Sequence, residues 1–128
     1  MSTIGEVMST DLLTVAEDTT LVATAAVMDA RRVGAVLVLR DGRLVGILTE
    51  RDVLRAAATG ELSGTVASWM TPHPETVEAE ETAAHAAVIM IHGGFRHLPV
   101  VDGGKPVGIV SIRDLMRHVL DDEAPRGV

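Results

Sequence analysis

The feature that most constrains this chain is a stretch of sequence that occurs twice. The segment Val45–Asp52 (VGILTERD) returns as Val107–Asp114 (VGIVSIRD), at an offset of 62 residues. The same offset relates Met8 to Met70, and it holds without a gap across each half. Because self-similarity at a fixed period indicates repeated structural units, the sequence predicts one unit of roughly sixty residues that is present twice.

The length and composition of the chain fit one compact body, or two small halves that share a core. Neither half of a 128-residue chain buries much apolar surface alone, so we expect the halves to pack face to face. The hydrophobic residues make up 47% of the chain, which supports a core. The period predicts two domains: residues 1–62, a first repeat with an N-terminal lead-in and a linker, and residues 63–128, a second repeat with an acidic C-terminal tail.

Charge and cysteine content narrow the classes of function. The absence of cysteine excludes disulfides, thiolate catalysis and cysteine-ligated metal. We find no signal sequence and no apolar run near the ~18 residues that a membrane span needs, so we expect a cytoplasmic protein without a membrane partner. The formal net charge of −7 is a poor match for nucleic acid, and an anionic ligand must therefore be held by a local cluster of donors.

Apolar runs, capping residues and turn residues predict the order strand, helix, strand, strand, helix in each half. Asp41-Gly42 predicts a two-residue hairpin, and Gly34 is expected to end the first helix. Residues 1–11 are expected to be irregular and residues 121–128 to fray. The elements expected in the first half are strands at 12–15, 35–39 and 44–48 and helices at 21–32 and from residue 49 onwards.

Three predicted helices carry much of the apolar sequence. Residues 82–91 are apolar nearly all round, and such a helix is normally buried on more than one side. A body this small covers one side from within, so we expect a second copy to cover the other and form a homodimer. The helices after the repeated motif carry matching apolar stripes, Val53, Leu54, Ala57 and Ala58 in the first half and Leu115, Met116, Val119 and Leu120 in the second.

The repeated motif itself contains Thr49-x-x-Asp52 and Ser111-x-x-Asp114, placed where a strand turns into a helix. A Thr or Ser at the N-cap with an acid at the third helical position is a capping box, which needs no ligand. The same geometry also suits binding, because free N–H groups at a helix start hold an anion and a carboxylate accepts from the vicinal hydroxyls of a ribose. An arginine next to each aspartate adds positive charge. The residues alone leave both interpretations open.

Over nearly its whole length the chain resembles a tandem pair of cystathionine-β-synthase (CBS) domains. The doubled motif, the entries Met8-Ser9-Thr10 and Met70-Thr71-Pro72, and the run Arg96–Val100 carry the resemblance. It implies an α/β (α+β) fold of two β-α-β-β-α repeats packed with pseudo-two-fold symmetry. It also implies a non-catalytic, energy-sensing regulatory module that binds an adenosine-containing ligand in clefts between the repeats. AMP, ADP and ATP are the expected ligands, S-adenosylmethionine and NAD are alternatives, and no catalytic cofactor is expected.

The resemblance assigns roles to residues of both halves. The two motif aspartates take the ribose, the motif hydroxyls and nearby basic residues take phosphates, and backbone around the first strand of each half lines the adenine. One difference separates the halves: Arg96-His97-Leu98-Pro99 is matched by Gly34-Ala35-Val36-Leu37, which predicts one tight site and one weak or empty site for AMP or ATP. The predicted ligand-binding residues are Thr14, Val15, Thr49, Arg51, Asp52, Thr76, Val77, Arg96, His97, Pro99, Ser111, Arg113 and Asp114.

Other functions find less support in the sequence. An interaction scaffold with decayed nucleotide sites is the main alternative to a ligand sensor, and either one acts through an effector protein that the sequence does not identify. His92-Gly93-Gly94-Phe95 is similar to an esterase oxyanion loop, but no Gly-x-Ser-x-Gly elbow accompanies it, and a helix stop explains it better. His85 and His92 stand two helical turns apart, ~10 Å, so one metal cannot join them. No catalytic residue and no metal site is predicted.

Overall fold

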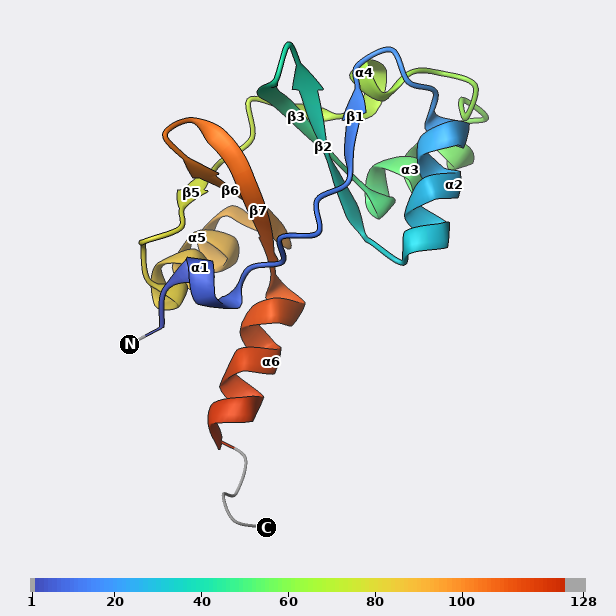
Figure 1. Cartoon of the computed structure of the whole chain (residues 1–128). Coiled ribbons are helices and arrows are strands. Elements are labelled where there is room, and N and C mark those ends of the chain that lie inside the picture. The colour runs from blue at the N-terminus through green and yellow to red at the C-terminus, as the bar shows by residue number, and fades with distance from the viewer. Residues whose placement is uncertain (1, 124–128) are drawn as a thin grey trace. The chain divides into compact units, whose positions relative to one another are not determined.

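The computed structural model describes residues 2–123, and the chain forms two compact units. The central unit is Leu12–Pro74, and the terminal unit is Met1–Asp11 together with Glu75–Val128. Residues 2–11, the lead-in of the first repeat, therefore pack with the second repeat, while residues 63–74, the lead-in of the second repeat, pack with the first. Each lead-in segment thus belongs to the sheet of the other repeat (Figure 1).

The central unit contains a four-stranded sheet in the order β1-β2-β3-β4. Strand β1 runs parallel to β2, and the other two neighbouring pairs are antiparallel. Two helices complete the repeat, and a short third helix, α4, lies in the lead-in of the second repeat. The elements are β1 (Thr14–Ala16), α2 (Leu21–Arg31), β2 (Ala35–Arg40), β3 (Arg43–Thr49), α3 (Glu50–Ala58), α4 (Val66–Trp69) and β4 (Thr71–Pro72).

The terminal unit repeats this arrangement with a sheet in the order β5-β6-β7. The N-terminal segment adds Ser9, which is bridged to Ile109 of β7 as β4 is paired to β3 in the central unit. This confirms the predicted α/β fold of two matching repeats. The elements are α1 (Ile4–Val7), β5 (Val77–Glu78), α5 (Ala83–Gly93), β6 (His97–Asp102), β7 (Lys105–Ser111) and α6 (Ile112–Glu123).

The turns and caps follow from residue types. Asp41 and Gly42 have φ of 51° and 78°, the left-handed pair that a tight hairpin needs, which confirms the predicted turn. Thr20 accepts a hydrogen bond from the Ala23 N–H at the start of α2. The predicted end of α2 at Gly34 is wrong: Arg32 is the C-cap, in the left-handed conformation with φ 54°. Gly94 holds the corresponding position after α5.

Two further expectations are corrected at the ends of the chain. The lead-in is not wholly irregular, because Ile4–Val7 forms α1 and Ile4 is fully buried in the core of the terminal unit. Residues 121–123 do not fray but form the last turn of α6, and residues 124–128 lie outside the described part of the chain.

Each unit has its own aliphatic core. In the central unit it includes Leu21 and Leu48, and in the terminal unit Met90 and Leu98. A methionine from each lead-in closes the sheet over a glycine. A Cβ at Gly46 would collide with the Met70 side chain, and one at Gly108 would collide with that of Met8. These two glycines are therefore required by close packing rather than by backbone conformation.

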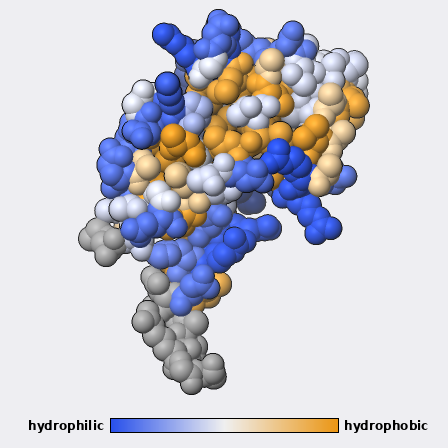
Figure 2. Space-filling view, in the orientation of Figure 1, coloured by the Kyte–Doolittle hydropathy of each residue, from blue (hydrophilic) through white to orange (hydrophobic). Residues whose placement is uncertain are grey.

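The apolar stripes predicted after the motif lie mostly on the outside. Leu54 of α3 and Leu120 of α6 are 69% and 64% exposed, whereas Asp52, Ala56 and Leu115 are turned inward. Apolar side chains also reach the surface on α2, as Figure 2 shows. Within residues 2–123, no helix combines the length and the apolar character that crossing a membrane requires.

Candidate ligand-binding site

In each unit, strand pairing places the motif beside the residues that begin the neighbouring strand. Thr49 ends β3 and is paired with Ala35, the first residue of β2. Ser111 ends β7 and is paired with His97, the first residue of β6. The Ile112 N–H also donates to the carbonyl oxygen of Arg96 at 2.9 Å. The structure therefore places Arg96 and His97 directly beside the Ser111 motif, although they precede it by more than a dozen positions in sequence.

The first strand of each repeat begins near the sheet edge that carries the motif. Since β1 is parallel to β2, its beginning lies near Ala35, and the Leu37 N–H donates to the Leu13 carbonyl oxygen at 3.0 Å. Thr14 is exposed and Val15 is half-buried in this strand. In the terminal unit Thr76 is half-buried, and Val77 is 2% exposed and belongs to the core. Only the backbone of Val77 remains for contact with a ligand.

The motif of the central unit is a capping box with an additional bond. The Thr49 N–H donates to Asp52 Oδ2 at 2.9 Å, and the Thr49 hydroxyl donates to the same oxygen at 3.2 Å. Asp52 Oδ1 lies 3.7 Å from Arg55 Nη1. With an exposed fraction of 7%, Asp52 is buried beneath these partners. The capping interpretation of this aspartate is confirmed, and its carboxylate is engaged on both oxygens.

The motif of the terminal unit forms the reciprocal capping box in its simplest form. The Ser111 N–H donates to Asp114 Oδ2 at 2.8 Å, and the Asp114 N–H donates to Ser111 Oγ at 3.0 Å. Here the hydroxyl accepts, so its own proton is left for another acceptor. Asp114 is half-buried, and the described residues form no salt bridge with it. This carboxylate is the more accessible of the two.

The N–H groups around both motifs are largely taken by the protein. Besides the bonds within each motif, the Glu50 N–H donates to the Gly34 carbonyl oxygen at 2.9 Å, as Ile112 does to Arg96. The protein itself thus uses several of the N–H groups that an anion at the helix start would need. A phosphate at this edge would depend mainly on side chains, and Arg51, Arg96 and Arg113 are all exposed.

Pro99 does not join the motif. It is buried inside β6, opposite Ile109 of β7. The N–H and carbonyl groups of Ile109 are both bonded to Ser9, so this pair needs no N–H from the proline. The strand position accounts for Pro99 without a ligand.

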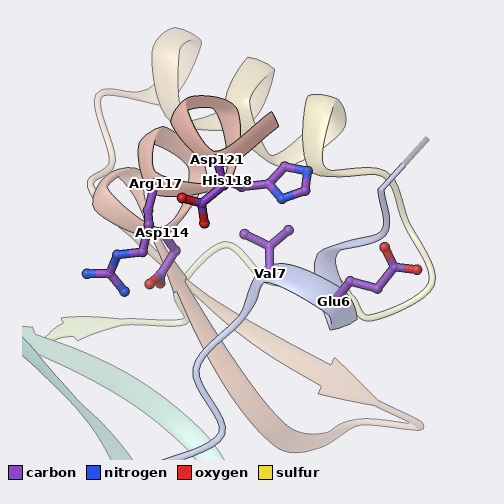
Figure 3. Close-up of a pocket in the computed structure, with 6 residues that line it drawn as sticks. All are labelled: Glu6, Val7, Asp114, Arg117, His118 and Asp121. Carbon is purple, nitrogen blue, oxygen red and sulfur yellow. The ribbon is translucent and has the colours of Figure 1, made fainter. Parts of the chain in front are cut away.

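A pocket that sequence reasoning missed lies between α1 and α6 of the terminal unit. Its volume is about 170 Å³, and Figure 3 shows its lining side chains, Glu6, Val7, Asp114, Arg117, His118 and Asp121. The four residues from α6 recur at helical spacing, which is the signal that could have found them. The two from α1 could not be found, because their packing on the second repeat is not encoded in spacing. Among the described residues, no cluster of three or more His, Asp or Glu side chains is arranged to hold a metal ion.

The clearest electrostatic effect lies away from the motifs, at the far end of β2. Arg40 donates to both carboxylate oxygens of Glu17, from Nε to Oε1 and from Nη2 to Oε2 at 2.7 Å. These hydrogen bonds lower the pKa of Glu17 below its ordinary value and raise that of Arg40. The pair ties the turn after β1 to the hairpin and takes no part in the candidate site.

Comparison with known proteins is consistent across sequence and structure. The family model described as "CBS domain" matches residues 4–59 and 66–121. A 17.7 kDa uncharacterised protein of Acidianus ambivalens is 36% identical over 120 residues, which cover 92% of this chain and 73% of the relative.

Two solved structures with a bound nucleotide are also similar. The CBS domain protein PAE2072 from Pyrobaculum aerophilum, complexed with AMP, is 30% identical with a TM-score of 0.85, and the match covers 94% of this chain and 96% of that one. CBSX2 from Arabidopsis thaliana in complex with AMP is 26% identical with a TM-score of 0.83, and the match covers 97% of this chain and all of that one.

Proposed function

Because this chain belongs to the CBS domain family and contains a pair of these domains, we propose that it is a non-catalytic regulatory module that binds an adenine nucleotide. A partner protein would bind differently to the nucleotide-bound and nucleotide-free forms of the module. Such signalling is limited by the difference in ligand affinity between the two states of the module. AMP is the leading candidate ligand, since two similar proteins have been solved with AMP bound.

The observation that carries the proposal is the arrangement at the start of α6. Arg96 and His97 stand beside Ser111, whose hydroxyl proton is not used in the capping box. Asp114 keeps one carboxylate oxygen outside that box. We assign Asp114 to the ribose hydroxyls, and Ser111 and Arg96 to the phosphate. Charge-assisted bonds from a guanidinium are about twice as strong as neutral ones, which suits a phosphate on a protein of net charge −7.

We also propose that the module is a homodimer. In the terminal unit α5 and α6 are neighbours, and both expose large apolar side chains; in the central unit the neighbours α2 and α3 do the same. Monomeric proteins rarely leave large apolar patches in water, and a second copy is the simplest cover. The exposed residues are Val22, Val27, Leu54, Val88, Ile91, Met116, Val119 and Leu120.

Light scattering tests the dimer. We expect twice the 13.5 kDa chain mass at tens of micromolar, and Ile91→Glu together with Leu120→Glu should give the monomer. A wild-type mass of one chain would contradict the proposal. Lys105→Glu, at the exposed start of β7, is the control for a change of charge outside the apolar faces.

A dimerisation scaffold without ligand is the second candidate function. Both motif aspartates already cap their helices without a ligand, which favours it. Mass spectrometry of small molecules released from the purified, denatured protein separates the two candidates, together with thermal shifts for AMP, ADP, ATP, S-adenosylmethionine and NAD. If the protein is a sensor, one of these ligands should be released on denaturation or should raise the melting temperature. GMP is the matched control for specificity toward adenine. No release and no shift would favour the scaffold.

A further inference from the structure

The two units differ in what covers the motif aspartate. At the offset of 62, Arg55 of α3 corresponds to Arg117 of α6, and Trp69 of α4 corresponds to Val7 of α1. The lead-in helix of each unit therefore places a different side chain near the same turn. In the terminal unit, Val7 lines an open pocket that Asp114 and Arg117 also border (Figure 3).

In the central unit the large side chain of Trp69 takes the position that corresponds to Val7. The guanidinium carbon of Arg55 lies 5.9 Å from the centre of the Trp69 ring, within the range of a cation–π contact. The same guanidinium is 3.7 Å from Asp52 Oδ1, the carboxylate oxygen that Thr49 does not use. Trp69 is half-buried and packs on the core of the central unit, so it gives Arg55 a fixed support.

Arg55 is an exposed side chain beside a buried carboxylate. Its side chain is 64% exposed, while Asp52 beneath it is 7% exposed. The separation of 3.7 Å is an ion-pair distance and too long for a hydrogen bond, so moving Arg55 aside breaks none. The guanidinium therefore lies next to the one carboxylate oxygen of Asp52 that the capping box leaves for a ribose hydroxyl.

We propose that Arg55, supported by Trp69, gates the Asp52 motif and makes the Asp114 motif the primary ligand site. This inference rests on the proposed function and names the residues that set the order of occupancy. The gate is specific to the central unit, because Val7 offers no ring to Arg117. Ligand enters the central motif only when Arg55 leaves Trp69, and the emission of the single tryptophan reports that movement.

The test uses adenosine as the probe, because it has no phosphate and loss of the Arg55 charge then has little direct effect on binding. In an Asp114→Ala background, calorimetry reports the central motif alone. Trp69→Val, which copies the residue at the corresponding position, should raise adenosine affinity about two- to fivefold, the factor equivalent to a lost exposed cation–π contact. Arg55→Ala should raise it at least as much. Arg43→Ala, at the opposite end of β3, controls for the loss of a positive charge.

The mirror experiment installs the gate in the terminal unit. In an Asp52→Ala background, Val7→Trp should weaken adenosine binding by a similar factor. The ligand-free tryptophan emission should also shift in Arg55→Ala but not in Arg43→Ala. Unchanged or weaker binding in both Trp69→Val and Arg55→Ala overturns the gate while leaving the proposed function intact. Absence of adenosine and AMP binding from the wild type and from every variant overturns the proposed function, and the gate falls with it.

Discussion

The central and terminal units begin their last helices with the same motif, but its neighbours differ. In the terminal unit Arg96 and His97 stand beside Ser111, and Asp114 borders an open pocket. In the central unit Gly34 and Ala35 take the corresponding places, and Asp52 is covered by Arg55. Duplication has preserved the scaffold of the motif, while changes around it have altered charge and access. We propose that capping and ligand binding are separable roles of one pair of residues.

The largest expected effect tests what the two units share. Gly108→Ala places a Cβ against the Met8 side chain and 3.0 Å from the Ser9 carbonyl oxygen, so the lead-in must shift. We expect a loss of about 1–3 kcal/mol in the free energy of unfolding, measured by urea denaturation. Gly46→Ala should cost a similar amount, since Met70 and Thr71 surround it in the same way.

Adding Met8→Ala to Gly108→Ala serves as the control for this clash. The double variant should cost less than the sum of the two single changes, because the truncated side chain makes room for the new methyl group. Strict additivity would mean that the methionine is not what the glycine accommodates.

The next effect tests the difference in charge. Arg96→Ala should weaken AMP binding by about 1–2 kcal/mol, roughly 5- to 30-fold, and leave adenosine binding nearly unchanged, because the guanidinium is assigned to the phosphate. Calorimetry with both ligands side by side is the measurement. Equal losses for AMP and adenosine would show that Arg96 supports the strand end rather than the phosphate. Gly34→Arg, the reverse change, should raise AMP affinity at the central motif.

A smaller effect tests the ends of the first helices. Arg32 holds a left-handed conformation after α2 that Gly94 holds after α5. Arg32→Gly should stabilise the protein by about 0.5–1 kcal/mol, because the strain of a Cβ at positive φ exceeds the entropy that glycine adds to the unfolded chain. Gly94→Arg should destabilise it by a similar amount in the same urea titration. A loss of stability in Arg32→Gly would point to a contact of the arginine side chain that offsets the strain.

The smallest effect concerns stability in acid and depends on the ion pair of Glu17 with Arg40. The terminal unit lacks this pair, because Ala79 and Asp102 stand at the corresponding positions. Arg40 lowers the pKa of Glu17 below 4.5, so this pair stabilises the folded state above the unfolded pKa. That contribution is lost as pH falls through the folded pKa. Glu17→Gln should therefore flatten the decline of stability below about pH 4.5. Equal slopes in the variant and the wild type would show that the exposed pair contributes nothing measurable.

Much of the fold follows from local sequence. The 62-residue offset predicts two equivalent units, Asp41-Gly42 predicts its hairpin, and the Thr/Ser-x-x-Asp spacing predicts the capping boxes. Each depends on residues that are close in the chain, so propensity and spacing are enough. The placement of Arg96 beside Ser111 could be anticipated from the strand order but not from spacing.

Other features could not be predicted from the sequence. Each repeat has a glycine in its third strand, Gly46 or Gly108, against which a methionine can pack. The sequence near Met8 therefore does not show which of the two glycines it contacts. The capping bond turns Asp52 inward and rotates the apolar stripe of α3 to the outside, which periodicity alone assigns wrongly. Arg55, which lies beside Asp52, also contacts Trp69 of another helix, and such a contact appears only in three dimensions.

The central claim is that Asp114 binds the ribose of an adenine nucleotide, and titration calorimetry of AMP tests it most directly. Asp114→Ala should weaken AMP binding at least tenfold, while loss of the capping acid should cost no more than about 0.5–2 kcal/mol of unfolding free energy. Asp52→Ala, the matched change in the gated motif, should alter AMP affinity much less. Unchanged affinity in Asp114→Ala, with AMP still bound by the wild type, would contradict the claim and leave the aspartate as a helix cap alone.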